Sequence, residues 1–347
     1  MRAFITGLAG LTLSQAEQAF LREAQPWGLI VFKRNADEPE QLRRLIDEAR
    51  ATLGREVPVL VDQEGGRVQR LGPPHWPEYP PAAAYGRLYD RDRGAGLLAA
   101  ELGAWLMAAD LASVGVDVDC MPIADVPTAG ADAIIGDRAF GEVPGKVAAL
   151  AGAFAQGLAQ GGVLPVLKHV PGHGRATADT HERLPVVMTE RETLEATDFA
   201  AFRLLAGLPL AMTAHVVFAA IDPVEPATTS TVIVRDVIRG WIGLRGVLMS
   251  DDLSMGALSG SLAARTQAAI AAGCDLALHC NADMEEMCEV AAAAPTLAGE
   301  AARRAAAALA GRTRAAAIDV AARRAEFAAL MRGIWEPALG WAQAWAS

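Results

Sequence analysis

Short apolar runs alternate with amphipathic helical patterns along most of this chain, and this alternation restricts the possible folds more than any other feature. Each run is bounded by polar or turn-forming residues, which is typical of a buried strand. The eight runs are residues 3–6, 28–32, 57–61, 116–121, 163–167, 210–214, 246–250 and 274–278. The segments with helical spacing between them are residues 14–24, 39–53, 95–114, 145–160, 190–206, 231–238 and 262–272. This α/β pattern predicts parallel strand–helix units that close into a single (β/α)8 TIM-type barrel.

The length of the chain fits one such barrel with a C-terminal helical extension. A barrel of this kind takes about 250 residues, and the chain has 347. We therefore expect a single domain over 1–347, with the barrel in about 1–285 and closing helices in about 286–347. The Ala/Arg-rich segment 291–333 predicts helices whose arginines lie on the solvated outer face. An open, doubly wound sheet is the alternative, but no G-x-G-x-x-G motif follows the first strands.

Charge and hydropathy exclude several classes of partner. The formal net charge is -10, so we expect no nucleic acid partner. The longest uncharged apolar stretch, 204–221, is interrupted by Gly207, Pro209 and His215, so we expect no membrane span. Glycines break the apolar run at the N-terminus, so it does not resemble a signal peptide. The four cysteines include no C-x-x-C pair, which indicates reduced thiols in a cytoplasmic protein. Nothing indicates an obligate partner, so we expect a monomer.

Polar side chains follow six of the predicted strands at the point where each strand ends. They are Asp62 to Arg70 after the third strand, Asp125 after the fourth, Lys168 and His169 after the fifth, His215 after the sixth, Asp251 and Asp252 after the seventh, and His279 and Asn281 after the eighth. In barrel enzymes the carboxyl ends of the strands carry the active site. The sequence therefore predicts one active site at this end of the barrel.

The densest polar segment is 166–181, where the fifth strand runs into a loop. It contains Lys168, His169, His173, Asp179 and His181. Asp179 and His181 are two residues apart, so the carboxylate can orient the imidazole and raise its pKa. Such a pair could serve as a general acid and base, whereas a lone loop histidine more often has a structural role. We expect the glycines around His173 to act as hinges of this loop.

Two adjacent aspartates follow the seventh strand. Successive strand side chains point to opposite faces, so Asp251 and Asp252 cannot both face the barrel axis. One of them is expected to be catalytic and the other to cap the turn, and the strand pattern does not choose between them. A carboxylate opposite an oriented acid/base suggests nucleophilic displacement at the anomeric carbon of a sugar.

Four motifs together carry a family resemblance. They are Asp62-Gln-Glu-Gly-Gly-Arg-Val-Gln-Arg70, Gly136-Asp-Arg-Ala-Phe-Gly141, Lys168-His-Val-Pro-Gly-His-Gly174 with Asp179-Thr-His181, and Ser250-Asp-Asp-Leu-Ser-Met255. In this order and spacing the chain resembles the glycoside hydrolase family 3 β-N-acetylglucosaminidases of bacterial peptidoglycan recycling, from about residue 3 to 285. Val170 stands where that family commonly has phenylalanine and Thr180 where it has serine, and neither change removes a catalytic group.

The resemblance implies a function and a set of roles. It implies a retaining exo-β-N-acetylglucosaminidase that removes terminal N-acetylglucosamine from N-acetylglucosaminyl-1,6-anhydro-N-acetylmuramyl peptides without a metal or other cofactor. By the same resemblance Asp251 is the nucleophile, His181 the acid/base, and Asp179 the residue that orients His181. The positions that match the family's sugar-binding residues are Asp62, Arg70, Arg138, Lys168 and His169.

Other functions remain open at this point. A β-glucosidase or a glycoside phosphorylase could use the same residues. A metal-dependent barrel hydrolase could use His169, His173, Asp179, His181 and Asp251 as ligands, although no H-x-H pair follows the first strand. A catalytically silent sugar-binding protein is the third alternative, and the presence of every candidate catalytic residue argues against it.

Overall fold

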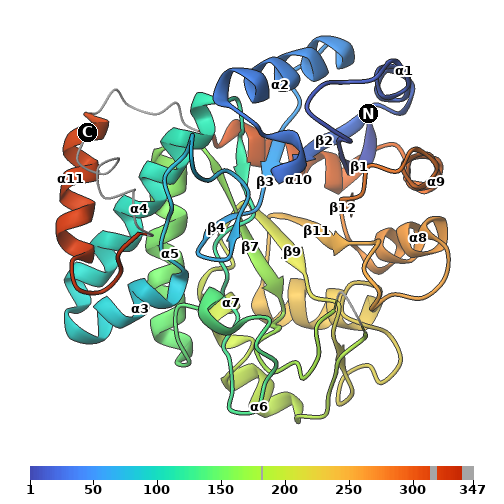
Figure 1. The fold of residues 1–347 in the computed structure, drawn as a ribbon. Helices are drawn as coiled ribbons and strands as arrows, with labels where there is room; N and C mark the ends of the chain where they lie inside the picture. Colours follow the sequence, from blue (N-terminus) through green and yellow to red (C-terminus); the bar gives the residue numbers. More distant parts are fainter. Residues whose placement is uncertain (181–182, 313–318, 338–347) are drawn as a thin grey trace.

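A closed barrel of parallel strands forms the centre of the molecule in the computed structural model, which describes residues 1–180, 183–312 and 319–337 (Figure 1). Its strands are β1 (Arg2–Gly7), β2 (Pro26–Val31), β3 (Val59–Val61), β6 (Val118–Asp119), β7 (Leu164–Val170), β9 (Leu210–Thr213), β11 (Val247–Asp252) and β12 (Leu276–His279). They pair in the order β1-β12-β11-β9-β7-β6-β3-β2, which closes the barrel. The predicted (β/α)8 TIM-type fold is therefore confirmed, and each of the eight predicted runs contributes one strand.

The two sides of the barrel wall are packed by alternate residues of each strand, because strand side chains have a period of two. In β11, Val247 and Met249 belong to the cluster that fills the barrel interior, whereas Leu248 belongs to the cluster beneath the helices. All three are fully buried, and burial of each such side chain contributes about 1.5–3 kcal/mol. The packed interior holds the strand ends, and hence the residues that follow them, in fixed positions.

Helices surround the barrel in the order in which they occur along the chain. They are α1 (Gln15–Ala24), α2 (Pro39–Leu53), α3 (Ala82–Arg91), α4 (Arg93–Ser113), α5 (Pro144–Gln160), α6 (Arg191–Ala196), α7 (Ala200–Leu204), η3 (Ile233–Ile242), α8 (Leu262–Ala272), α9 (Met284–Ala293), α10 (Gly299–Ala310) and α11 (Val320–Met331), with single-turn helices η1 (Lys33–Asn35) and η2 (Gly136–Arg138). Two short pairs of strands lie outside the barrel, β4 (Gln63–Gly65) with β5 (Val68–Gln69), and β8 (Val186–Val187) with β10 (Val217–Phe218).

The predicted helix over 190–206 is wrong in one respect, because the structure divides it into α6 and α7. The break contains Asp198, whose side chain is only 1 % exposed and binds Arg175, with Asp198 Oδ2 2.9 Å from Arg175 Nη2. A buried carboxylate needs such a partner. This long-range pair turns the chain inward where the local pattern would continue the helix.

Helix α4 is the one described helix that is long and apolar enough to cross a membrane by length and composition alone. Of its most apolar 18-residue window, 61 % is buried inside the protein. It packs between α5, α3 and α11 at the side of the barrel (Figure 1). Its apolar character is therefore that of a core helix.

Several arginines of the C-terminal helices are not on a solvated face, and this corrects the sequence interpretation. Arg304 of α10 binds the buried Asp275 through two of its nitrogens, Nε at 3.0 Å and Nη2 at 2.6 Å. Arg324 of α11 binds Asp110 of α4 at 2.8 Å. Buried carboxylates require such partners. Arg304 therefore holds α10 against the barrel, and Arg324 holds α11 against α4. Arg314 lies outside the described residues.

Candidate active site

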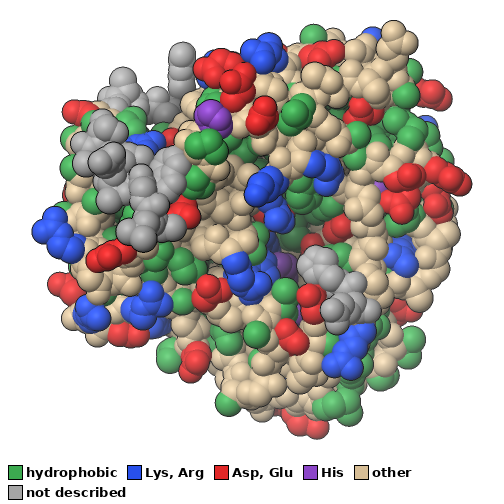
Figure 2. All heavy atoms as spheres, viewed as in Figure 1, with side chains coloured by type: hydrophobic (Ala, Val, Ile, Leu, Met, Phe, Trp, Pro, Cys, Tyr) green, Lys and Arg blue, Asp and Glu red, His purple; other side chains and the backbone are tan. Residues whose placement is uncertain are grey.

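A pocket of about 280 Å³ opens at the carboxyl ends of the barrel strands. Charged and histidine side chains surround a hollow near the middle of the face shown in Figure 2. The polar residues that line the pocket include Asp62, Glu64, Arg70, Arg138, Lys168, His169, His173, Thr180, Asp251 and Asp252. All five residues predicted to bind sugar, and the predicted nucleophile, are therefore brought together here from separate strand ends.

Lys168 lies at the centre of the charged groups on one wall. It is 2 % exposed at the end of β7, and its Nζ lies 2.9 Å from Asp62 Oδ1 and 2.7 Å from Glu64 Oε1. Asp62 also binds Arg70, with Nη2 3.1 Å from its Oδ2. These ion pairs join the end of β7 to the loop that follows β3, 106 residues away in sequence.

Glu64 is a member of this cluster that sequence reasoning did not assign. It accepts two parallel hydrogen bonds from Arg138, Nε to Oε2 at 2.7 Å and Nη2 to Oε1 at 2.8 Å. It is 2 % exposed. Glu64 therefore holds Lys168 and Arg138 in place together. Its position inside the Asp62–Arg70 motif indicated that Glu64 lies near the site. Its partners, however, are known only from the tertiary structure.

Burial and charge oppose one another in this cluster, and charge prevails. Burial would raise the pKa of Asp62 and of Glu64, but Lys168 with Arg70 or Arg138 outweighs it and holds both pKa values below the ordinary range. Burial would lower the pKa of Lys168, and the two carboxylates raise it instead. The wall therefore presents fixed charges, which suit the hydroxyl groups of a sugar because charge-assisted hydrogen bonds are strong.

The structure distinguishes the two adjacent aspartates. Asp252 accepts hydrogen bonds on Oδ1 from the Ser254 N–H at 3.1 Å and the Cys280 N–H at 3.1 Å, and on Oδ2 from the Ser254 hydroxyl at 2.6 Å. Its carboxylate is therefore occupied in capping the turn after β11. Asp251 Oδ1 accepts a hydrogen bond from the Asp252 N–H at 2.8 Å, and the Asp251 side chain lines the pocket.

The surroundings of Asp251 favour its ionised form. Burial would raise the pKa of Asp251, but the nearby His215 and His169, together with the Asp252 N–H, lower it. The end of β11 is fixed by β9 and the segment that follows it. The Asp251 N–H donates to Thr213 Oγ1 at 3.2 Å, and His215 Nε2 donates to the Asp252 carbonyl at 2.9 Å. His215, noted in the sequence only as a strand-end residue, is thus a support of this aspartate.

His169 and His173 share a buried carboxylate that sequence reasoning had also left without a role. Asp125, at 0 % exposure, lies 2.7 Å from His169 Nδ1 through Oδ2, and it accepts the His173 N–H on Oδ1 at 2.6 Å. Burial and the neighbouring His169 lower the pKa of His173 to about 4. Asp125 therefore fixes the orientation of the His169 ring and braces the start of the loop.

The loop that follows β7 reaches the same pocket. Thr180 is buried and lines it, and the Thr180 carbonyl accepts the Ala257 N–H at 3.0 Å, which joins this loop to the one after β11. Asp179, next to Thr180, is half-buried. The predicted acid/base His181 lies outside the described residues. Gly174 lies so close to Val126 that a Cβ atom would be 2.2 Å from its carbonyl oxygen, so close packing, as well as any hinge role, requires glycine there.

A closed (β/α)8 barrel with a half-buried carboxylate of lowered pKa in a charged pocket defines a barrel enzyme of the glycoside hydrolase type. The chain matches the glycosyl hydrolase family 3 N-terminal domain over residues 5–313. It therefore belongs to glycosyl hydrolase family 3.

Known proteins of this family resemble the chain over most of its length. A β-hexosaminidase of Alkalilimnicola ehrlichii is 42% identical over 280 residues, which cover 79% of this chain and 79% of that protein. NagZ of Neisseria gonorrhoeae in complex with N-trifluoroacetyl-D-glucosamine is 31% identical and superposes with a TM-score of 0.82, covering 100% of this chain and 98% of that one. The same protein in complex with a zinc ion is 32% identical, with a TM-score of 0.80 and coverage of 95% and 96%.

The described residues of the metal-ligand alternative do not form a metal-binding cluster among themselves. Within 1–180, 183–312 and 319–337, no group of three or more His, Cys, Asp or Glu side chains could hold a metal ion. His169 Nδ1 is engaged by Asp125. His181 is the one member of the alternative ligand set that the structure does not describe.

Proposed function

We propose that the protein is a retaining exo-β-N-acetylglucosaminidase that removes terminal N-acetylglucosamine from N-acetylglucosaminyl-1,6-anhydro-N-acetylmuramyl peptides. The single observation that carries this proposal is the position of Asp251, a half-buried carboxylate of lowered pKa that lines the pocket and does not cap the turn. Its relatives, named β-hexosaminidases, support the choice of an N-acetylated sugar. The peptidoglycan fragment rests on the motif resemblance.

The pocket's size and charges support binding of one terminal sugar. A volume of about 280 Å³ is just below the usual range of sites for drug-sized ligands, roughly 300–1,000 Å³, and favours one ring over a longer chain. In the proposal Asp62, Arg70, Arg138, Lys168 and His169 hold the hydroxyl groups. The remainder of the substrate then lies outside the pocket, as an exo-acting enzyme requires.

The proposed reaction is a double displacement. An Asp251 carboxylate oxygen attacks the anomeric carbon while the glycosidic bond breaks, and His181 donates its proton to the leaving oxygen. In the second step His181 takes a proton from water, the water oxygen attacks the anomeric carbon, and the bond to Asp251 breaks. Asp179 orients His181 in both steps. Configuration is retained because two inversions occur.

The proposal is tested by Asp251→Asn with a chromogenic aryl N-acetyl-β-glucosaminide. We expect kcat to fall by about 10³-fold or more, since loss of a nucleophile removes the covalent step, while the melting temperature stays close to that of the wild type. Asp47→Asn, on the exposed face of α2, is the matched control. Activity of the Asp251 variant within a few-fold of wild type would contradict the nucleophile assignment.

A second experiment tests His181 and the substrate. His181→Ala should slow glycosides with poor leaving groups far more than activated aryl glycosides, because only the former need protonation; equal slowing would count against the acid/base role. Products from the anhydro-muramyl peptide and from aryl β-glucosides, each with and without phosphate, separate the proposed hydrolase from a β-glucosidase and from a phosphorylase.

A further inference from the structure

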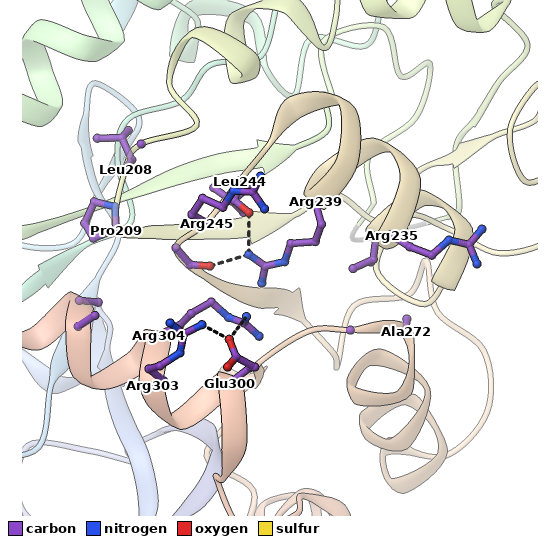
Figure 3. A pocket seen from close by; sticks show the side chains of 16 residues that line it. Leu208, Pro209, Arg235, Arg239, Leu244, Arg245, Ala272, Glu300, Arg303 and Arg304 are labelled. Atoms are coloured by element: carbon purple, nitrogen blue, oxygen red, sulfur yellow. Dashed lines mark hydrogen bonds and ion pairs between the residues drawn. The ribbon is translucent and has the colours of Figure 1, made fainter.

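A second hollow, of about 790 Å³, lies at the opposite end of the barrel from the active-site pocket. Its walls are the segments that enter β9 and β11, residues 207–209 and 244–246, together with η3, the end of α8 and one face of α10 (Figure 3). Among the residues that the structure describes, none of those proposed for catalysis or sugar binding lines it. Its volume is in the range of sites for small molecules.

Arginine side chains gather around this hollow in an otherwise acidic protein. Those with their charged groups toward it are Arg239, Arg245, Arg303 and Arg304, whereas Arg235 points away from the other four and pairs with Asp236 (Figure 3). Their acidic partners here are Glu300 and Asp275. Four arginines against two carboxylates leave a local charge of +2, whereas the chain carries -10.

The two inner arginines are held rigidly. Arg239 donates from Nη1 to the carbonyls of Leu244 at 3.1 Å and Gly246 at 2.7 Å, and from Nη2 to Asp275 at 2.9 Å. Arg304 binds the other side of the same carboxylate. Asp275 is 3 % exposed and needs this compensation. Arg239 therefore fastens η3 to the barrel and Arg304 fastens α10 to it, and the two guanidinium groups form a fixed positive floor of the hollow.

The two outer arginines, Arg245 and Arg303, form fewer hydrogen bonds and ion pairs than the inner two. Arg245 is exposed, and no hydrogen bond or ion pair joins it to another residue of the described chain. Arg303 pairs with Glu300, whose Oε2 also lies 3.8 Å from Arg304 Nη1 (Figure 3). The Glu300 carboxylate thus occupies a position where an anion from solution would meet both Arg303 and Arg304.

We propose that this hollow binds a small polyanion that carries phosphate groups, with Arg245 and Arg303 as its main contacts and Glu300 as an internal competitor. Guanidinium groups match phosphate oxygens with paired hydrogen bonds. The rigid floor of Arg239 and Arg304 lowers the conformational cost of binding, because those side chains are already ordered. The proposal is independent of the reaction at the other end of the barrel.

Titration calorimetry of the full chain with inorganic pyrophosphate at low ionic strength tests it. Arg245→Ala and Arg303→Ala should each weaken binding by about tenfold or more, the usual worth of a hydrogen bond to a charged group. Glu300→Gln should tighten binding several-fold, since it removes the competing carboxylate. Arg44→Ala, an exposed arginine of α2, should leave the affinity unchanged.

Three results would overturn the proposal. One is the absence of pyrophosphate binding at millimolar concentration to both the wild type and Glu300→Gln. Another is binding that survives Arg245→Ala and Arg303→Ala but is lost in Arg70→Ala, which would place the anion in the active-site pocket. The third is citrate binding as tightly as pyrophosphate with the same arginine dependence, which would reject phosphate as the recognised group.

Discussion

Replacement of Glu64 by glutamine tests whether the charged wall of the active site stabilises the protein as well as shaping it. The change keeps the side-chain shape but removes the charge that faces Lys168 at 2.7 Å and Arg138 at 2.7 and 2.8 Å. Removal of one partner from a buried ion pair costs about 3–5 kcal/mol. Glutamine keeps one acceptor oxygen, so we expect the free energy of unfolding to fall by about 3 kcal/mol, at the lower end of this range.

That loss of free energy converts to a shift in melting temperature. At about 2.1 cal/mol/K per residue, unfolding of a chain of 347 residues carries an entropy of roughly 0.7 kcal/mol/K. A loss of about 3 kcal/mol therefore lowers the melting temperature by about 4 °C. Because Lys168 and Arg138 would also lose their common anchor, we expect kcat/KM to fall by up to about 10²-fold, as misplacement of binding groups can do.

Scanning calorimetry at pH 7 measures the shift, with Glu23→Gln on the exposed face of α1 as the matched control, expected within about 0.5 kcal/mol of wild type. The folded pKa of Glu64 is lowered, so its contribution is present above the unfolded pKa and is lost as pH falls. The difference between wild type and Glu64→Gln should therefore shrink below about pH 4. Melting within 1 °C of wild type at pH 7 would refute the reasoning and show that desolvation cancels the ion pairs.

Three further predictions concern the loop after β7 and metal dependence. The pKa of His173 is lowered from 6.5 to about 4, so below pH 6.5 the unfolded chain binds a proton that the native state does not. Between pH 7 and pH 5 this group should lower the free energy of unfolding by about 2 kcal/mol. Urea unfolding of His173→Gln should show a pH dependence that is smaller by this amount, and an unchanged pH dependence would contradict the assignment to His173. Gly174→Ala should lower the free energy of unfolding by about 1–3 kcal/mol, because the added Cβ overpacks against Val126. The control Gly145→Ala, at an open helical position, should raise it by up to about 1 kcal/mol. Equal melting temperatures for the two variants would reject the close-packing argument. Activity should survive prolonged treatment with a strong chelator, and its loss with restoration by zinc would favour the metal-dependent alternative.

The fold and the position of the active site were predictable because both depend on local periodicity. Apolar runs such as 163–167 and 246–250 became β7 and β11, since a strand that is buried on both faces must be apolar throughout its length. The polar residues that interrupt the pattern, Lys168 and Asp251 among them, then fall at one end of the barrel.

Contacts between distant parts of the chain could not be predicted in this way. The sequence places Glu64 in a motif and Asp125 after the fourth predicted strand. Their partners, Arg138 and His169, lie 74 and 44 residues away along the chain. The same limit explains why the arginines of α10 and α11 were expected in solvent. A helical pattern shows that a segment is a helix, whereas a buried carboxylate such as Asp275 is recognised as a partner only once the chain has folded.

The sequence by itself thus determined the barrel, the end at which its polar residues gather, and the loop on which the histidines lie. Only the tertiary structure decided that Asp252 caps the turn while Asp251 faces the pocket, and that Glu64 holds Lys168 and Arg138 together. The physical reason is that side-chain period and apolar spacing are properties of neighbouring residues. The hydrogen bonds that occupy one carboxylate and leave another facing the pocket depend on groups brought from other strands.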